Sequence, residues 1–196
     1  TKKAQRKKIT EAIGPIWEAN HVWLIVVVVL MFAGFPRAFS AMMTALHVPV
    51  TLMLIGIVLR GSAFAFRAYD PSPVSRRRWG VVFSVASLLT PVLLGVSLAG
   101  IVAGNLEWDA EGIYRSGFIV PWLVPFHWTL GLFTLGIFAY LAAVYLCVET
   151  RAEPALNAAF RRRAIAAGVL LAPLALATWI ALPASAAHFA DRFTES

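Results

Sequence analysis

The residues best suited to chemistry lie in one stretch near the start of the chain, Gly14 to Leu24. It places an acid, an amide, an imidazole and two indoles just before a long apolar run. Pro15 suits the first turn of a helix, whose positive end favours an anion at Glu18. Glu18 and His21 are three residues apart, so a helix places them on one face. A carboxyl and an imidazole side by side can pass a proton between them, which makes this pair a candidate proton pathway. The alternative is a structural acid that pairs with His21 or with an arginine.

Two tryptophans and an asparagine complete this stretch. Trp17 and Trp23 are expected either to anchor the membrane interface, where tryptophan is enriched, or to line a passage. Asn20 is expected to hydrogen-bond to a neighbouring helix. An acid and an amide beside an apolar run need protein or water next to them, because lipid cannot satisfy them. The stretch therefore predicts a polar helix face covered by another helix.

Two further histidines, His47 and His127, lie in separate apolar segments. At the rise per residue of a helix, His47 lies about 12 Å below the outer end of its predicted span and His127 about 9 Å below the outer end of its own. Two imidazoles at similar depth on different helices are candidate ligands of one haem iron. The alternative is a pair of histidines that hydrogen-bond between helices.

Five apolar segments must position these side chains. The chain has 196 residues, of which 60% are hydrophobic and only 14% are charged. Soluble domains carry about a quarter charged residues. Long uncharged windows therefore predict an all-α, polytopic helical membrane protein with a single transmembrane domain. The predicted spans cover about residues 13–35, 39–59, 79–102, 121–148 and 164–187. Small residues that permit close helix approach occur in the third and fourth spans, at Gly95, Ser97, Gly100, Gly131 and Gly136.

The placement of the basic residues predicts the topology. Fourteen of the 17 Lys and Arg residues fall in the N-terminal run and in the second-to-third and fourth-to-fifth connections, against only Arg37, Arg115 and Arg192 on the other side. Short cytoplasmic loops carry such an excess, so the N-terminus is expected in the cytoplasm and the C-terminus outside. The net charge of +7 is explained in this way without nucleic acid as a partner. The chain contains no GxGxxG, P-loop or CxxC motif, and Cys147 is its single cysteine.

A family resemblance rests on the first stretch, which reads Gly14-Pro15-x-Trp17-Glu18-x-Asn20-x-Val22-Trp23-Leu24. It resembles the signature of subunit II of the cytochrome bd-type quinol oxidases, where many members read GPxWDGNQVWL. The similarity continues at Phe35-Pro36, in the segment Leu59 to Arg67, and at Pro91 and Pro125. The chain departs from the family at Ala65, where an acid is common. By the family pattern we expect a further helix before Thr1 and more helices after Ser196, so that this chain would be a fragment or the middle part of a subunit.

The resemblance implies a haem-free membrane subunit of a terminal oxidase that oxidises quinol and reduces oxygen to water. No cofactor is then expected on this chain. The haems and the quinol site would lie in a larger subunit I, and small accessory subunits are further candidate partners. By resemblance, Glu18 would belong to a proton pathway and Trp23 would border an oxygen-access channel. His21 joins that pathway only through its place beside Glu18 on one helix face. The resemblance also implies the inner or cell membrane of a bacterium or archaeon.

Two other functions stay open on the residues alone. One is a b-type haem membrane cytochrome ligated by His47 and His127. The other is a proton-coupled transporter that uses Glu18, although the chain lacks the broken-helix repeats common in such proteins. A visible absorption spectrum, with and without copurifying partners, separates these functions from the oxidase subunit.

Overall fold

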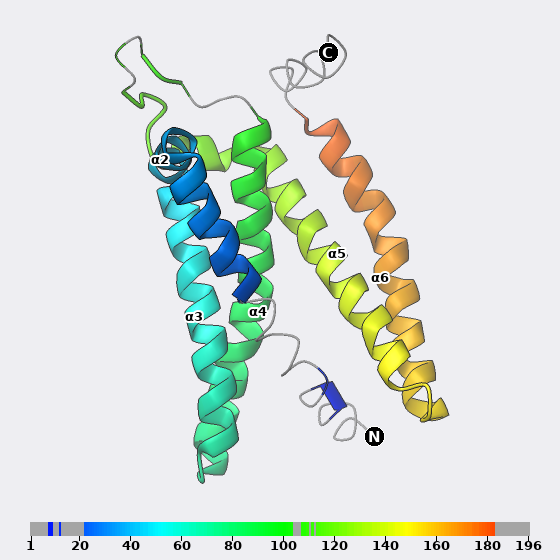
Figure 1. Ribbon diagram of the computed structural model, residues 1–196. Helices are drawn as coiled ribbons and strands as arrows, with labels where there is room; N and C mark the ends of the chain where they lie inside the picture. The colour runs from blue at the N-terminus through cyan, green and yellow to red at the C-terminus, as the bar shows by residue number, and fades with distance from the viewer. Residues whose placement is uncertain are drawn as a thin grey trace. The chain divides into compact units, whose positions relative to one another are not determined.

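The structure is a computed structural model that describes residues 8, 9, 12, 22–103, 107–109, 111 and 113–182. Its helices follow one another along the chain (Figure 1) as a helix Val22–Gly34, α2 (Pro36–Ala45), α3 (His47–Tyr69), α4 (Pro73–Val102), the 3-10 turn η1 (Val120–Leu123), α5 (Pro125–Glu149) and α6 (Pro154–Ile180). Within these described ranges, the only pairing of extended backbone is an isolated antiparallel bridge between Trp108 and Tyr114. The predicted all-α class is confirmed. Two compact units make up the chain, Thr1–Met42 with Ile137–Leu170 and Met43–Gly136 with Leu171–Ser196.

In the second unit, α3 and α4 form an antiparallel hairpin that turns at residues 70–72 (Figure 1). Pro71 lies within this turn and prevents α3 from continuing, since it restricts the residue before it and lacks a backbone donor. Asp70 accepts the backbone N–H of Ser72 at 2.8 Å, and Pro73 opens α4 as its first residue. Beyond the turn, the rings of Phe66 and Trp79 stack with their centroids 4.8 Å apart. The turn is therefore held by local polar contacts and by one aromatic pair.

Glycines allow α4 and α5 to meet at backbone distance in the same unit. A Cβ atom added to Gly95 would lie 2.6 Å from the Cα of Gly131 and 2.7 Å from the carbonyl oxygen of Leu130. A Cβ on Gly131 would lie 2.8 Å from the carbonyl oxygen of Val92. The small residues predicted to permit close helix approach thus serve contacts between helices of this chain.

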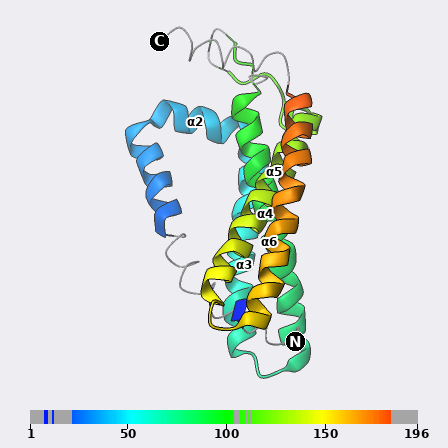
Figure 2. The ribbon, with the colours of Figure 1, turned by 90° about the vertical axis from the view of Figure 1, so that its right-hand side faces the viewer.

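In the first unit, the end of α5 and the start of α6 form a second hairpin (Figure 2). The Asn157 side chain donates to the carbonyl oxygen of Cys147 at 2.6 Å and so ties α6 to the last turn of α5. Leu146, Leu156 and Phe160 form a buried cluster beside it. These contacts explain why α6 begins at Pro154, well before the predicted start of the fifth span at 164. Residues 161–163, predicted to lie in a polar connection, are therefore helical.

The second predicted span, 39–59, also differs from the structure. The helix Val22–Gly34 ends at the predicted turn, and α2 leaves it at an angle of 115°. A membrane-length helix then begins only at His47, after a break at Leu46. Along α2, polar residues lie at helical spacing and form one polar face, at Arg37, Ser40 and Thr44. This polar face interrupts the apolar run between the first helix and α3. An amphipathic helix of this kind is typical of a membrane surface.

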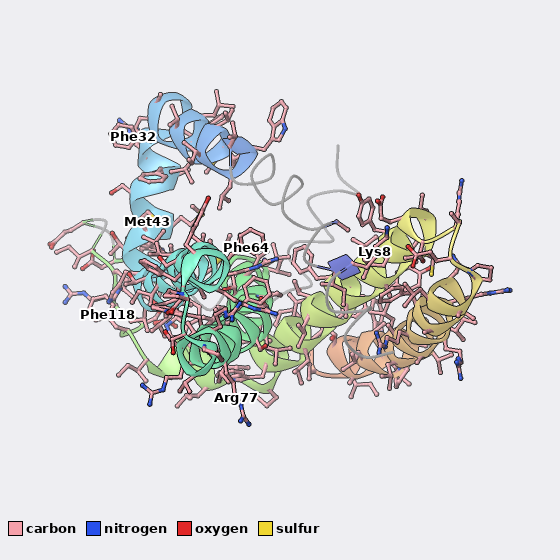
Figure 3. The ribbon with its side chains drawn as sticks, turned by 90° about the horizontal axis from the view of Figure 1, so that it is seen from below. Lys8, Phe32, Met43, Phe64, Arg77 and Phe118 are labelled. Carbon is pink, nitrogen blue, oxygen red and sulfur yellow. The ribbon has the colours of Figure 1, made fainter. Side chains whose placement is uncertain are left out.

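The distribution of side chains indicates a lipid environment. The buried residues of α4 are all small or β-branched, namely Ala86, Gly95, Val96, Ser97, Ala99 and Gly100. Large apolar side chains such as Val169 and Trp179 instead lie on the outside. Arg77, at the start of α4, points away from α3 and α4 (Figure 3). Four described helices are long and apolar enough to cross a membrane, or five if the bent pair counts as one span. The molecule is therefore a polytopic helical membrane protein.

Candidate functional site

Four residues of the predicted site, Trp17, Glu18, Asn20 and His21, lie outside the described residues. The proton pathway at Glu18 and His21 and the helix-packing roles of Trp17 and Asn20 therefore stay predictions. Trp23 is described, in the first turn of the helix Val22–Gly34, and 69% of it is exposed. Its indole is thus available to lipid or to another subunit.

His47 lies at the start of α3 and makes local contacts. Its Nδ1 is 3.0 Å from the carbonyl oxygen of Thr44, one turn earlier in the chain. Its ring meets Phe118 edge to face, with the centroids 4.6 Å apart. Thr44 lies in the last turn of α2, so this hydrogen bond links α3 to the helix directly before it and not to a helix distant in the sequence.

His127 lies in the first turn of α5 and is 0% exposed. Its ring meets Trp122 edge to face at 5.6 Å, and Phe126 lies on another side at 6.1 Å. Among the described residues, neither ring nitrogen has a hydrogen-bond partner. A buried imidazole without partners loses its bonds to water and gains none, so this arrangement is unfavourable for a merely structural histidine.

The segment from Phe118 to Trp122 links the two histidines. Phe118 contacts His47, Trp122 contacts His127, and the Trp122 indole donates to the carbonyl oxygen of Phe118 at 2.9 Å. Among the interactions of the described residues, none joins His47 to His127 directly. The nitrogens of His127 are enclosed by protein atoms, so the structure offers no open face there for a porphyrin. Bis-histidine haem ligation stays a prediction without support from this geometry.

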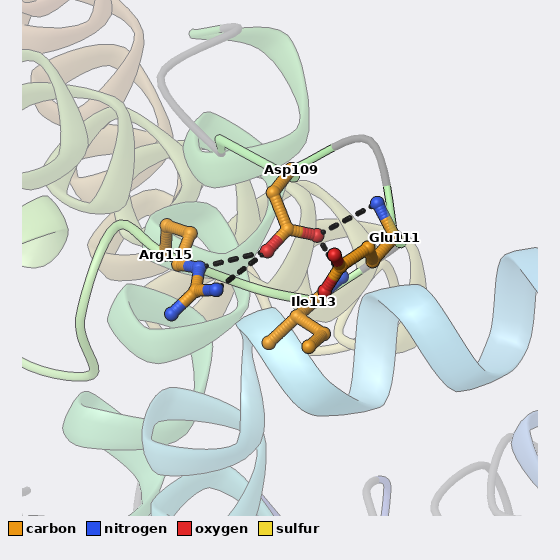
Figure 4. Close-up of polar contacts among 4 residues, drawn as sticks. All are labelled: Asp109, Glu111, Ile113 and Arg115. Atoms are coloured by element: carbon orange, nitrogen blue, oxygen red, sulfur yellow. Dashed lines mark hydrogen bonds and ion pairs between the residues drawn. The ribbon is translucent and has the colours of Figure 1, made fainter.

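The connection between α4 and η1 contains an ordered polar centre that the sequence did not reveal (Figure 4). One carboxylate oxygen of Asp109 accepts the backbone N–H groups of Ile113 at 2.7 Å and Glu111 at 3.1 Å. The other oxygen pairs with Arg115, whose Nε lies 2.9 Å away. The N–H of Ile113 has the largest effect on the pKa of Asp109 and lowers it. Desolvation opposes this shift, whereas Arg115 and the N–H of Glu111 add smaller effects that also lower the pKa.

This connection was predicted only as the segment between the third and fourth spans, on the side opposite the basic connections. Aspartate often accepts the backbone N–H groups of the residues that follow it, which is the one signal in the sequence that could have pointed to Asp109. Arg115 was counted as an outer charge for the topology, and its pairing with Asp109 is decided by the tertiary structure. Across the described segments, no group of three or more His, Cys, Asp or Glu side chains could hold a metal ion.

The fold and these features define the class as a polytopic α-helical membrane protein with a polar stretch at the start of its first predicted span. Residues 1–191 match the family described as cytochrome bd terminal oxidase subunit II. The chain belongs to that family, which confirms the resemblance seen in the sequence.

Two relatives illustrate the similarity. The cytochrome bd ubiquinol oxidase subunit 2 of Bacillus subtilis (strain 168) is 32% identical over 107 residues, 55% of this chain and 31% of the relative. The cytochrome bd-I ubiquinol oxidase subunit 2 of Escherichia coli (strain K12) is 27% identical over 152 residues, 76% of this chain and 40% of the relative. The chain thus matches less than half of the length of each relative.

Proposed function

We propose that this chain is a haem-free membrane subunit of a cytochrome bd-type terminal oxidase, a complex that oxidises quinol and reduces oxygen to water. The observation that carries the proposal is the match of residues 1–191 to the subunit II family. The names of the two relatives, both ubiquinol oxidase subunits, agree with it. The haems and the quinol site would lie in the larger subunit I, and the chain would occupy a bacterial inner membrane with its N-terminus in the cytoplasm.

The chain would act as a scaffold for that larger subunit. Its exposed surface is apolar over the helix Val22–Gly34, from Val22 through Leu30. In a membrane, lipid or another helix can cover this surface. The acid and amide that precede it favour another helix, because lipid cannot satisfy them. A larger subunit that packs against this helix would be stabilised by it.

Glu18 and His21 would carry protons from the cytoplasm toward the site of oxygen reduction. The motivation is the place of Glu18 at the family's acid position, beside His21 and at the predicted cytoplasmic end of the first span. Trp23, exposed one turn later, would border a path for oxygen. The reduction of oxygen to water consumes protons, so a subunit beside the haems is a suitable place for their supply.

The experiment that tests this function compares Glu18→Gln with Glu18→Asp in the assembled complex. Gln keeps the shape and the hydrogen bonding of the acid but cannot take up and release a proton at working pH. We expect Glu18→Gln to assemble with all haems and to lose at least about tenfold in oxygen consumption, typical of a lost proton-transfer group. Glu18→Asp should restore much of the rate.

Glu11→Gln is the matched control, because Glu11 lies in the same N-terminal segment but outside the motif. It should leave oxygen consumption unchanged. Wild-type turnover in Glu18→Gln would restrict Glu18 to a structural role. A haem band in the purified chain without partners would contradict the haem-free assignment and favour the cytochrome alternative.

A further inference from the structure

An open cleft of about 460 Å³ lies between α5 and α6 in the first unit. Tyr140, Val144 and Cys147 of α5 line one side, and Arg161, Ala164 and Gly168 of α6 line the other. We call it the α5–α6 cleft. The proposed oxidase function uses none of these residues.

The local sequence explains why the two helices leave this space. The hairpin is fixed at its turn by the bond from Asn157 to Cys147 and by the buried side chain of Phe160. Beyond that point α6 presents two small residues toward α5, Ala164 and Gly168. A Cβ atom on Gly168 would already lie 3.3 Å from the ring of Tyr140, so the ring covers this glycine. The walls of the cleft are consequently fixed and mostly apolar.

Arg161 gives the cleft one basic end. It belongs to three consecutive arginines, and the other two have other contacts. Arg162 donates to the carbonyl oxygen of Ala158 at 3.5 Å, and the guanidinium of Arg163 lies 5.5 Å from the centre of the Phe160 ring. The acid of the turn, Glu153, is paired with Lys8 at 3.2 Å. Arg161 takes part in neither of the ion pairs formed between described residues, Lys8 with Glu153 and Arg115 with Asp109.

The position of Arg161 along α6 corresponds to the level of lipid headgroups. Residues 164–190 contain no Asp, Glu, Lys or Arg, so the three arginines mark the edge of the apolar segment. From there the cleft extends toward Val169, which is 67% exposed and lies on the apolar side. A ligand that fills the cleft needs an anion at the arginine and a hydrocarbon chain in the membrane.

We propose that the α5–α6 cleft binds one anionic phospholipid, with its phosphate on Arg161 and an acyl chain between Val144 and Ala164. A guanidinium binds phosphate with two parallel hydrogen bonds, which a point charge does not match. Basic pockets between transmembrane helices bind lipid headgroups in this way. A quinone would fill the apolar part without using the arginine, and a helix of another subunit would exclude lipid altogether.

The test measures lipid binding to the full-length protein with its copurifying subunits. After delipidation, native mass spectrometry compares phosphatidylglycerol with phosphatidylcholine of the same acyl chains. We expect Arg161→Gln to weaken phosphatidylglycerol binding at least about tenfold, because it removes both charged hydrogen bonds to the phosphate. Arg162→Gln is the matched control and should change binding less than about twofold. Arg161→Lys should restore only part of it.

A second measurement locates the lipid. Phosphatidylglycerol with a photoreactive group in its acyl chain should cross-link to peptides that contain residues 140–147 or 161–169. Val169→Trp, a change at an exposed position that leaves the hairpin contacts intact, should reduce this cross-linking by narrowing the cleft.

Equal binding by Arg161→Gln and Arg162→Gln would overturn the proposal, as would equal affinity for the two lipids. Cross-linking of Cys147 to another subunit would assign the cleft to a protein partner. These measurements report lipid binding and not oxidase activity. A negative result would therefore contradict the lipid site without contradicting the proposed oxidase function.

Discussion

At the scale of single residues, His127 is a buried imidazole with two unsatisfied nitrogens among aromatic rings. Replacing a buried polar group that has no partner by an apolar ring of similar shape is neutral or stabilising. We therefore expect His127→Phe to keep the thermal stability of the complex within about 1 kcal/mol of wild type, or to raise it. The haem spectrum should not change, because the proposed function places no haem on this chain.

His47→Phe is the matched control, since His47 is exposed and bonds only one turn back. A marked loss of stability in His127→Phe alone would mean that water, lipid or another subunit satisfies the imidazole. Loss of the same haem band in both variants would instead support ligation of one haem by the two histidines.

Asp109 predicts a pH dependence of the connection between α4 and η1. Its folded pKa lies below the ordinary value of 3.8, so its bonds stabilise the loop fully above pH 3.8. This contribution is lost as the pH falls through the lower folded pKa, because the protonated carboxyl no longer attracts Arg115. Hydrogen exchange at the N–H of Ile113, corrected for the intrinsic rate at each pH, should be slow at pH 7 and should speed up below pH 3.8.

Asp109→Asn should show faster exchange at Ile113 already at pH 7, because the amide cannot pair with Arg115 by charge. Glu107→Gln is the control, since the neighbouring contact of Glu107 to Ser116 uses its backbone N–H. Unchanged exchange at Ile113 in Asp109→Asn would show that the backbone bonds alone hold this loop.

At the scale of the elements, the contact of α4 with α5 depends on Gly95 and Gly131. A methyl group on Gly95 would meet backbone atoms, which cannot move aside as the end of a flexible side chain can. We expect Gly95→Ala to destabilise the protein by about 1–3 kcal/mol, the usual effect of overpacking. Thermal unfolding of the purified complex measures this change.

Gly80→Ala is the matched control on the same helix, because no atom lies within 4 Å of an added Cβ there. It should be neutral, or stabilising by less than about 1 kcal/mol through helix propensity. Equal stability of the two variants would mean that α4 and α5 do not approach this closely in the assembled protein.

At the scale of the whole molecule, α4 separates a basic end, with three arginines in its first turns, from a connection that carries three acids and one arginine. Its 30 residues span about 45 Å, more than the hydrocarbon thickness of a bilayer. In a Cys147→Ser background, Tyr69→Cys and Glu111→Cys should react with a membrane-impermeant maleimide from opposite sides. Tyr69 is suitable because it is 88% exposed at the end of α3. Leu52→Cys, in an apolar turn of α3, should stay unlabelled.

The basic side is predicted to be cytoplasmic, so Arg151→Cys in the α5–α6 turn should label from the same side as Tyr69→Cys. Labelling of the Tyr69 and Glu111 variants from one side would refute both the span order and the topology. Intact cells and inverted vesicles give the two orientations needed for this measurement.

The sequence by itself determined the class and the family, and much of the order of the spans. Uncharged apolar runs must be helical in a membrane, since every backbone N–H needs an internal partner. The end of the first span, at about residue 35, was also predicted, because the proline that follows removes a backbone donor and restricts its neighbour. The motif around Glu18 is defined by residues close together in the sequence. It therefore indicates the family without knowledge of the fold.

The tertiary structure decided what depends on contacts between distant residues. The packing of Phe160 and the bond from Asn157 to Cys147 moved the start of α6 to Pro154 and placed Arg161 beside a cleft. A glycine permits another helix to approach closely, but the sequence does not identify that helix. Only the fold therefore showed that Gly95 packs against Gly131. The burial of a side chain depends on all of its neighbours, many of them distant in the sequence. The enclosure of His127 could therefore be seen only in the tertiary structure.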